Sequence, residues 1–449
     1  MCRLSKWMCA FAALMVGQSF AAPTKIHAGS AKDVVLGELN TLRGTFAGGG
    51  ATNSTPSGDS GGQLPLAIVN NMAGAGEGDL NAYVTGRDNN NNVVMLASDG
   101  SWFYPPGASS TEPTLVDADI GIPLGAQGST TDVTLPGFVS SGRVYFAVGK
   151  LQFFVVNDAT SGTVLAEPSP VNPADPNADV NWGFVELTNT AKGGLYANIS
   201  YVDFVGLILG MSLVTTNGSV QTALGLQPDA VSSICSSLSS QSSQDGYPWS
   251  NLCMVDSQSN YLRVLSPYQY IENGNAEAFS DYFTSYIDTV YSKFGGSGGG
   301  NGSLVINTQG DSGNVSCTSA GNTLTCDGDN RDYPKPSAGD IFGCNTGTFG
   351  LQTSDNPTHY AVVPRLCAAF NRATFLLSGG NVQPGPPAAS YYSSPPSNYY
   401  SKFVHEHEID GKGYAFSYDD VNPAGENESG VVSSNSPKSL TITVGGPST

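Results

Sequence analysis

Short runs of alternating apolar and polar residues constrain the fold of this chain most strongly. The runs cover residues 64–69, 82–85, 93–96, 143–155, 182–188 and 197–205. Clusters of turn-forming residues, such as Asp88–Asn92 and Asp99-Gly100, separate them. Alternation of this kind places one set of side chains on each face of a β-strand. Strands at such close spacing, with no helices between them, predict a mainly β fold with a sandwich or barrel.

The middle of the chain has a helical period instead. Apolar side chains recur every three or four residues over 231–238 and again over 279–294. Asn275 is the candidate N-cap of the second helix, and Gly295 is its candidate stop. A third helix is expected from about Pro364 to Arg372.

The cysteines are concentrated in the same region. Six of the eight lie between residues 235 and 367, while Cys2 and Cys9 belong to the N-terminal segment. In a secreted chain an even number predicts three disulfides, although six cysteines allow 15 connectivities. Neighbours are expected to pair, because Cys317 and Cys326 bracket a short hairpin pattern. The cysteines do not indicate a metal site, since no C-x-x-C spacing occurs.

The N-terminus has the layout of a cleaved secretory signal. Arg3 and Lys6 precede an apolar run over residues 7–16, and Ser19 and Ala21 occupy the small-residue positions before the cleavage point. The run is too short to span a bilayer. We therefore expect residues 1–21 to be a signal peptide and the protein to be secreted, extracellular or in a cell wall.

The charge balance excludes several kinds of partner. The chain has 18 basic and 37 acidic residues and a net charge of −19, and loss of Arg3 and Lys6 makes that charge more negative. Such a chain repels nucleic acid and anionic lipid. Only 12% of its residues are charged, so most of its surface is neutral and polar. We expect a neutral partner, no nucleic acid, no membrane, and a monomer.

The two periodicities suggest a division of the chain. Residues 63–215 and 400–449 are expected to form a β-domain, into which residues 216–399 are inserted as a disulfide-stapled α/β domain. A wide groove between two such parts is the default place for an extended ligand. Residues 22–62 are expected to be a flexible N-terminal segment.

Towards the C-terminus, the pair Asp410-Gly411 predicts a hairpin between strands at 403–409 and 414–418. On such a strand His405 and His407 would share one face, which is a geometry compatible with a metal site. No third ligand is evident, and we expect no metal there. Gly58–Gly62 spells the nucleophile segment of one protease class, but too little chain precedes it for that fold.

Two carboxylates on apolar strands are the strongest sign of chemistry. In the run 182–188, a period of two places Glu186 on one face with Trp182, Phe184 and Thr188. A carboxylate among aromatic and branched residues is costly to bury, so it needs a partner or a purpose.

The second carboxylate is Asp203, which the same period places with Ile199, Tyr201 and Val205. One interpretation is that both acids bind loop backbone. The other is that they face a groove in which aromatic rings stack on sugars. Glycoside hydrolysis needs one protonated acid at the leaving oxygen and one ionised carboxylate that activates water or attacks carbon.

The segments 182–188 and 197–206 together resemble glycoside hydrolase family 64, the thaumatin-like, laminaripentaose-producing endo-β-1,3-glucanases. Segments 143–149, 365–372 and 413–421 support the resemblance, which extends from about residue 64 to 446. It implies a thaumatin-like β-sandwich or barrel domain and a wide groove. It also implies β-1,3-glucan, such as laminarin, curdlan or cell-wall glucan, as the substrate, and neither a metal nor an organic cofactor.

By motif match, the resemblance implies that Glu186 is the general acid and Asp203 the general base of an inverting reaction. Such carboxyl groups lie roughly 6.5–9.5 Å apart. The substrate contacts are expected from the side chains that share their faces: Trp182, Phe184, Thr188 and Tyr201. A non-catalytic, thaumatin-like glucan-binding cell-wall protein is the alternative. Such a protein could dispense with an acid, and the presence of both favours the enzyme.

Overall fold

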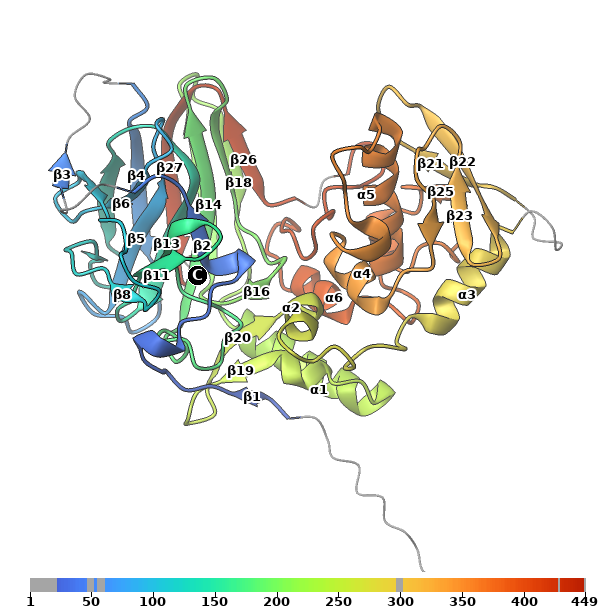
Figure 1. Ribbon diagram of the computed structural model, residues 1–449, viewed down its shortest axis with the longest axis horizontal. Helices are drawn as coiled ribbons and strands as arrows, with labels where there is room; N and C mark the ends of the chain where they lie inside the picture. Colours follow the sequence, from blue (N-terminus) through green and yellow to red (C-terminus); the bar gives the residue numbers. More distant parts are fainter. Residues whose placement is uncertain (1–21, 47–51, 55–60, 296–301, 427–428, 448–449) are drawn as a thin grey trace, which may run out of the picture.

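The structure is a computed structural model that describes residues 22–46, 52–54, 61–295, 302–426 and 429–447. The expected signal peptide, and Asp59 and Ser60 of the protease-like motif, lie outside these residues. Figure 1 shows a lobe of strands beside a second lobe that contains α5 (Pro357–Asn371), with α1 (Ala230–Asp245) and α6 (Tyr399–Glu406) low between them. In the described residues, no helix is both long and apolar enough to cross a membrane.

Two large sheets form the first lobe, as the alternating runs predict. The nine-stranded sheet contains, in order, β26 (Val431–Ser434), β15 (Gly194–Asn198), β14 (Trp182–Thr190), β11 (Val139–Val148), β5 (Leu80–Arg87), β6 (Val93–Leu96), β7 (Trp102–Tyr104) and β3 (Thr52–Ser54), with β9 (Ile122–Pro123) beside β5. The five-stranded sheet contains β10 (Thr130–Leu135), β4 (Leu64–Asn70), β27 (Pro437–Val444), β17 (Leu209–Thr215) and β18 (Val220–Ala223).

Alternating apolar residues hold these two sheets together. Leu66 and Ile68 of β4 are buried in the same core as Val144 of β11 and Val185 of β14. The last strand, β27, pairs in parallel with β4, so both ends of the described chain build this lobe. The mainly β fold is therefore confirmed.

A smaller sheet covers part of the outer face of the nine-stranded sheet. Its strands, in order, are β2 (Thr41–Arg43), β13 (Gly162–Ala166), β12 (Phe154–Asp158) and β8 (Thr114–Leu115). Leu42 and Leu165 from this layer share a second core with Tyr145 and Trp182. The covered part of the face is thus apolar and closed to solvent.

The N-terminal segment differs from the expectation of flexibility. β1 (Thr24–Lys25) pairs in parallel with β19 (Cys253–Val255), and β2 pairs with β13. Short 3-10 helices at Ala31–Asp33 and Glu38–Asn40 lie between β1 and β2. The expectation is wrong for residues 22–46, because their backbone groups find partners on two sheets that are distant in sequence.

The junction below the lobes holds a second four-stranded sheet, β1-β19-β20-β16, in which β20 (Tyr261–Leu265) pairs with β16 (Phe204–Val205). The short helix α2 (Pro267–Glu272) follows β20 directly. In the second lobe are α3 (Thr284–Lys293), α4 (Ala338–Gly343), α5 and a five-stranded sheet. That sheet is ordered β24 (Tyr333–Pro334), β23 (Thr323–Cys326), β22 (Asn314–Ala320), β21 (Leu304–Asn307) and β25 (Val382–Gln383).

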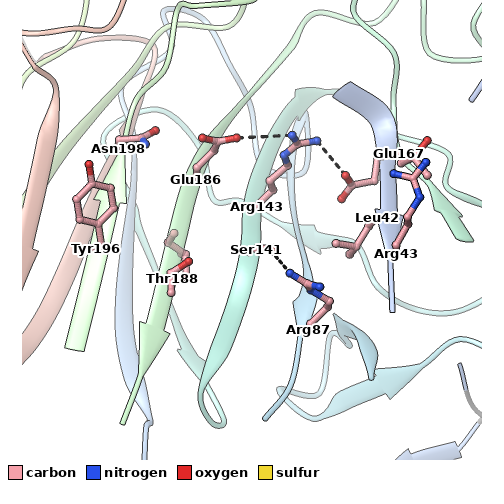
Figure 2. A pocket seen from close by; sticks show the side chains of 13 residues that line it. Leu42, Arg43, Arg87, Ser141, Arg143, Glu167, Glu186, Thr188, Tyr196 and Asn198 are labelled. Carbon is pink, nitrogen blue, oxygen red and sulfur yellow. Dashed lines mark hydrogen bonds and ion pairs between the residues drawn. The ribbon is translucent and has the colours of Figure 1, made fainter. Parts of the chain in front are cut away.

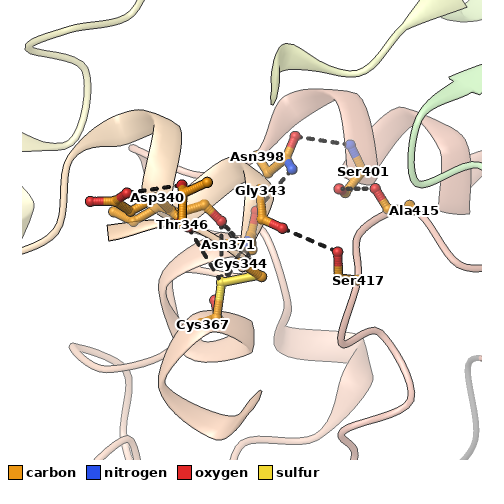
Figure 3. The surroundings of a disulfide bond; sticks show 11 residues. Asp340, Gly343, Cys344, Thr346, Cys367, Asn371, Asn398, Ser401, Ala415 and Ser417 are labelled. Atoms are coloured by element: carbon orange, nitrogen blue, oxygen red, sulfur yellow. Dashed lines mark hydrogen bonds between the residues drawn. A yellow bond between two sulfur atoms is a disulfide. The ribbon is translucent and has the colours of Figure 1, made fainter. Parts of the chain in front are cut away.

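Neighbouring cysteines pair, as expected. The bonds are Cys235–Cys253, Cys317–Cys326 and Cys344–Cys367. The third bond joins the end of α4 to α5 (Figure 3). Beside it, the Asn371 amide donates to the Ile341 carbonyl at 2.6 Å and accepts from Asn398 at 2.9 Å. The second lobe is thereby fixed to the residue that caps α6.

The helix predictions are right in type and less accurate in length. α1 covers the predicted 231–238 pattern. α3 begins at Thr284, well after Asn275. α5 begins at Pro357, before the predicted start at Pro364, because Asn356 caps it by accepting the His359 N–H.

The predicted strand at 403–409 is wrong, since α6 extends to Glu406. Asn398 caps the helix by accepting the Ser401 N–H, and Tyr400, Phe403 and Val404 are buried at helical spacing. No hairpin pairs 403–409 with 414–418 in the described residues. His405 and His407 therefore do not share a strand face.

His405 belongs to a buried charge network that connects the lobes. Its Nδ1 lies 2.9 Å from Glu408, and its Nε2 lies 2.9 Å from Asp419. Asp419 also pairs with Arg372 of the second lobe at 2.8 Å. Burial opposes the charged imidazole, but the two carboxylates outweigh it and raise the pKa of His405 well above its usual value. The backbone of Leu226, just before α1, forms an isolated antiparallel β-bridge with that of Glu408.

We expect His405→Phe to lower the free energy of unfolding by about 3–5 kcal/mol, because it leaves buried carboxylates without their partner. The raised pKa means that this contribution is complete below the unfolded pKa of about 6.5 and is lost as pH rises through the folded pKa. Urea unfolding at acidic and alkaline pH measures both effects.

Lys402→Gln is the matched control, since Lys402 lies on the same helix and forms a 3.8 Å surface pair with Glu406. Such a pair contributes less than about 1 kcal/mol. Equal losses for the two variants would show that the network does not stabilise the junction.

Candidate active site

Glu186 lies on the outer face of the nine-stranded sheet, beyond the edge of the covering layer. On β14 the face that carries Phe184, Glu186 and Thr188 is partly exposed, while the residues between them are buried in the core. This confirms the predicted alternation. The Glu186 side chain is 40% exposed. Register places it opposite Arg143 of β11 and opposite Asn198 of β15.

Arg143 is the main partner of Glu186. Its guanidinium lies 3.6 Å from the Glu186 carboxylate and 2.9 Å from that of Glu167. It also donates to the Leu39 carbonyl at 2.6 Å and lies over the Phe184 ring, 4.8 Å from its centroid. Partners on β14 and on two segments distant from it in sequence therefore fix the cation that faces Glu186.

Asp203 reaches the site from a bend and not from a strand. β15 ends at Asn198, after which Ile199 and Tyr201 donate backbone hydrogen bonds to Gly430 and Tyr414. The predicted continuous strand over 197–205 is thus wrong, and Asp203 does not follow its alternation. The Asp203 carbonyl accepts the Ser266 N–H at 2.8 Å, which anchors the bend to the start of α2.

The environment of Asp203 favours its protonated form. The pKa of Asp203 is raised to about 6, chiefly by burial and in addition by the negative charges of Glu186 and Glu38, against two opposing effects. The opposing effects are a 2.9 Å hydrogen bond from Gln269 and the charge of Arg143. The two candidate carboxylates are therefore close enough to interact electrostatically.

A groove of about 530 Å³ contains Glu186 in its floor. Figure 2 shows how its labelled side chains are arranged across the groove, from Tyr196 and Asn198 past Glu186 and Arg143 to Arg87 and Arg43. The full lining is Thr41, Leu42, Arg43, Arg87, Ser141, Gly142, Arg143, Glu167, Glu186, Leu187, Thr188, Tyr196 and Asn198. Asp203 is not part of that lining.

Of the predicted contact residues, Thr188 lines the groove and Phe184 lies partly exposed beneath Arg143. Trp182 and Tyr201 do not fit the prediction. Trp182 is 1% exposed, because the covering layer buries that end of β14, and Tyr201 is 5% exposed. A ring buried in this way cannot stack on a sugar, so both are corrected to core residues.

Sequence reasoning missed several groove residues. Arg143 begins the segment 143–149, and a single arginine in an apolar strand is itself a signal of a buried partner. Tyr196 is 47% exposed and lies opposite Thr188. Arg43 could not be predicted as a groove residue, because nothing in the local sequence indicates that residues 41–43 pair with β13 and line the same groove as Glu186.

Asp419, which lies in the C-terminal segment of the family resemblance, has partners within the protein and not in the groove. Asp419 is fully buried, and besides its ion pairs it accepts the Ala415 N–H at 2.8 Å. Among the described residues, no group of three or more His, Cys, Asp or Glu side chains could hold a metal ion.

Similarity to known proteins identifies the family of this chain. The family model described as β-1,3-glucanase, glycoside hydrolase 64, matches residues 62–444. The glucan endo-1,3-β-glucosidase of Cellulosimicrobium cellulans is 27% identical over 373 residues, which cover 80% of this chain and 61% of that protein. That of Arthrobacter sp. (strain YCWD3) is 26% identical over 378 residues with the same coverage. The chain thus spans about 61% of the length of these curated relatives.

Solved structures give the same result. A laminaripentaose-producing β-1,3-glucanase in complex with laminaritetraose has a TM-score of 0.72 and 27% identity, covering 85% of this chain and 98% of its own. A β-1,3-glucanase domain from Clostridium beijerinckii, with a TM-score of 0.63, 22% identity and the same coverage, shares the fold. Because the family model matches well over half of its residues, this chain belongs to the glycoside hydrolase 64 family of β-1,3-glucanases.

Proposed function

We propose that this chain is a secreted, endo-acting glycoside hydrolase that cleaves β-1,3-glucan with Glu186 and Asp203. The observation that carries the proposal is the pairing of a half-exposed Glu186 in the groove floor with a buried Asp203, whose pKa is raised by burial and in addition by the Glu186 charge. Membership of the family supports it, as does similarity to two glucan endo-1,3-β-glucosidases. A structural relative was solved with laminaritetraose, a β-1,3-linked oligosaccharide.

In the proposed reaction Glu186 donates a proton to the glycosidic oxygen as the bond to the anomeric carbon breaks. Asp203 removes a proton from a water molecule that attacks the same carbon from the opposite face. The reaction then inverts the anomeric configuration, for which the two carboxyl groups need a separation of roughly 6.5–9.5 Å. A carboxylate with a pKa of about 6 is a stronger base than an exposed aspartate, which suits this role.

Neutral polar and aromatic groups beside Glu186 suit an uncharged polysaccharide. Thr188 and Asn198 offer hydrogen-bonding groups, and the exposed Tyr196 ring offers a face on which a sugar can stack. Such a groove, open to solvent, accepts an internal stretch of a long chain such as laminarin, curdlan or cell-wall glucan.

The finer organisation is part of the same proposal. We infer a thaumatin-like β-domain from residues 63–215 and 400–449, with residues 216–399 inserted as an α/β domain. The parallel pairing of β27 with β4 supports a β-domain made from both ends. Three disulfides support secretion, since such bonds persist in oxidising compartments. We expect the protein to act as a monomer.

We expect Glu186→Gln and Asp203→Asn each to lower kcat on laminarin by at least about 10²-fold, because each removes one proton transfer. Release of reducing sugar from laminarin and curdlan measures the loss. A fully active Glu186→Gln variant would exclude the proposed mechanism.

Thermal unfolding is the control for those variants. At pH 7 the ionised Asp203 is disfavoured by burial, so Asp203→Asn is expected to be at least as stable as the wild type. Because the pKa of Asp203 is raised in the folded state, this advantage grows as pH rises from about 4 to 6. It disappears below that window, where the carboxyl is protonated in both states. Loss of activity together with lower stability at neutral pH would point to misfolding.

The pH dependence separates the two roles. If Asp203 is the base, it must be ionised, and kcat/KM should fall as pH drops through about 6. If Asp203 were the acid, kcat/KM would fall as pH rises through the same value. The charged groups that set this pKa are Glu186, Glu38 and Arg143. A kcat/KM profile from pH 4 to 8 decides between these outcomes.

Sedimentation with insoluble curdlan, run beside the hydrolysis assay, tests the non-catalytic alternative. The enzyme should bind curdlan and release oligosaccharides with the inverted anomeric configuration. Binding without product from the full chain would instead indicate a wall-binding protein.

A further inference from the structure

We propose that residues 37–43, here called the N-terminal strap, form one wall of the substrate groove and bind the glucan chain at a distance from Glu186, chiefly through Arg43. This inference rests on the proposed function. The strap lies outside residues 62–444, which match the family model, so the match provides no counterpart for it. Its residues Thr41, Leu42 and Arg43 nevertheless line the same groove as Glu186.

The strap is fixed in place by buried hydrogen bonds. Asn40 is 2% exposed, and its side chain donates to the carbonyls of Val35 and Glu167 and accepts the Gly37 N–H. The Glu167 N–H donates back to the Asn40 carbonyl at 2.8 Å. Leu42 pairs with Leu165 and is buried with it. A wall held in this way has a defined shape before substrate arrives.

The strap is also connected to the candidate catalytic residues. The Leu39 carbonyl accepts from Arg143 at 2.6 Å, and Arg143 lies 3.6 Å from Glu186. Glu167, which binds Asn40 through its backbone, pairs with Arg143 through its side chain. The strap therefore helps to orient the guanidinium that faces Glu186.

Arg43 has hydrogen-bond donors to spare. β2 is the edge strand of the covering sheet, and Arg43 is exposed on it at the margin of the groove. Its Nε donates to Ser161 at 3.1 Å, and no ion pair with an acidic side chain is found for it in the described part of the chain. A guanidinium has five N–H donors, and the remainder suit the hydroxyl groups of a neutral sugar.

The distance from Glu186 makes the effect depend on chain length. Arg87 lines the same groove as Arg43 and lies on β5, two strands from Glu186 on β14 (Figure 2). Two strand spacings correspond to about 10 Å. A bound chain must therefore extend beyond the sugar at the cleavage point to reach the strap. Oligosaccharides too short to span this distance should gain nothing from Arg43.

The test compares Arg43→Ala with the wild type on β-1,3-linked gluco-oligosaccharides of increasing, defined length. We expect kcat/KM on the longest substrates to fall about three- to tenfold, the range of one to two lost hydrogen bonds. On the shortest substrate that is cleaved, kcat/KM should remain unchanged. Arg43→Lys, which keeps a cationic donor, should recover part of the loss.

Lys32→Ala is the matched control, because Lys32 is an exposed cation on the same N-terminal segment that does not line the groove. It should leave every substrate unaffected. Equal losses on short and long substrates for Arg43→Ala, or no loss on any, would overturn the inference. Failure of the wild type to cleave any β-1,3-glucan would instead refute the proposed function, so the two failures are distinguishable.

Discussion

The guanidinium of Arg143 is the contact on which the candidate site depends. Arg143 lies on β11 of the nine-stranded sheet. Its guanidinium pairs with Glu167 of the covering layer and donates to the Leu39 carbonyl of the N-terminal strap, so it joins the sheet to both. The same group faces Glu186 at 3.6 Å. A buried cation of this kind is stable only where several acceptors surround it, so the layers must meet at one place. The position of Glu186 is therefore a consequence of how these layers pack as well as of strand register.

Asp203 shows a second constraint of the same kind. Its bend is anchored by Ser266 and its carboxylate by Gln269, both at the start of α2. The junction that holds α2 also contains α1 and α6, and the His405 network ties α6 to Arg372 of the second lobe. The pair of carboxylates thus combines one residue fixed by the β lobe with another fixed by the junction. Disturbance of the junction should reach Asp203 before it reaches Glu186.

The period of two was enough to predict the mainly β fold and the shared face of Phe184, Glu186 and Thr188, and the helical period was enough to predict α1. The period of two could not predict burial. Trp182 points to the same side of the sheet as Glu186. The covering layer, which is built from segments distant in sequence, buries Trp182 and leaves Glu186 in the groove. At 403–409, alternating histidines and glutamates obscured a helix whose signal was the cap at Asn398 and the apolar spacing of Tyr400, Phe403 and Val404.

The N-terminal segment shows why composition alone misleads about order. Residues 37–43 contain little that would form a core, and as an isolated peptide they would have no reason to fold. They are ordered because Asn40 satisfies polar groups of Glu167 that would otherwise be buried without partners. The polar groups that need partners belong to Glu167, and the strap supplies those partners. One margin of the groove thus depends on a segment that is held in place by polar groups of the covering layer and not by its own core.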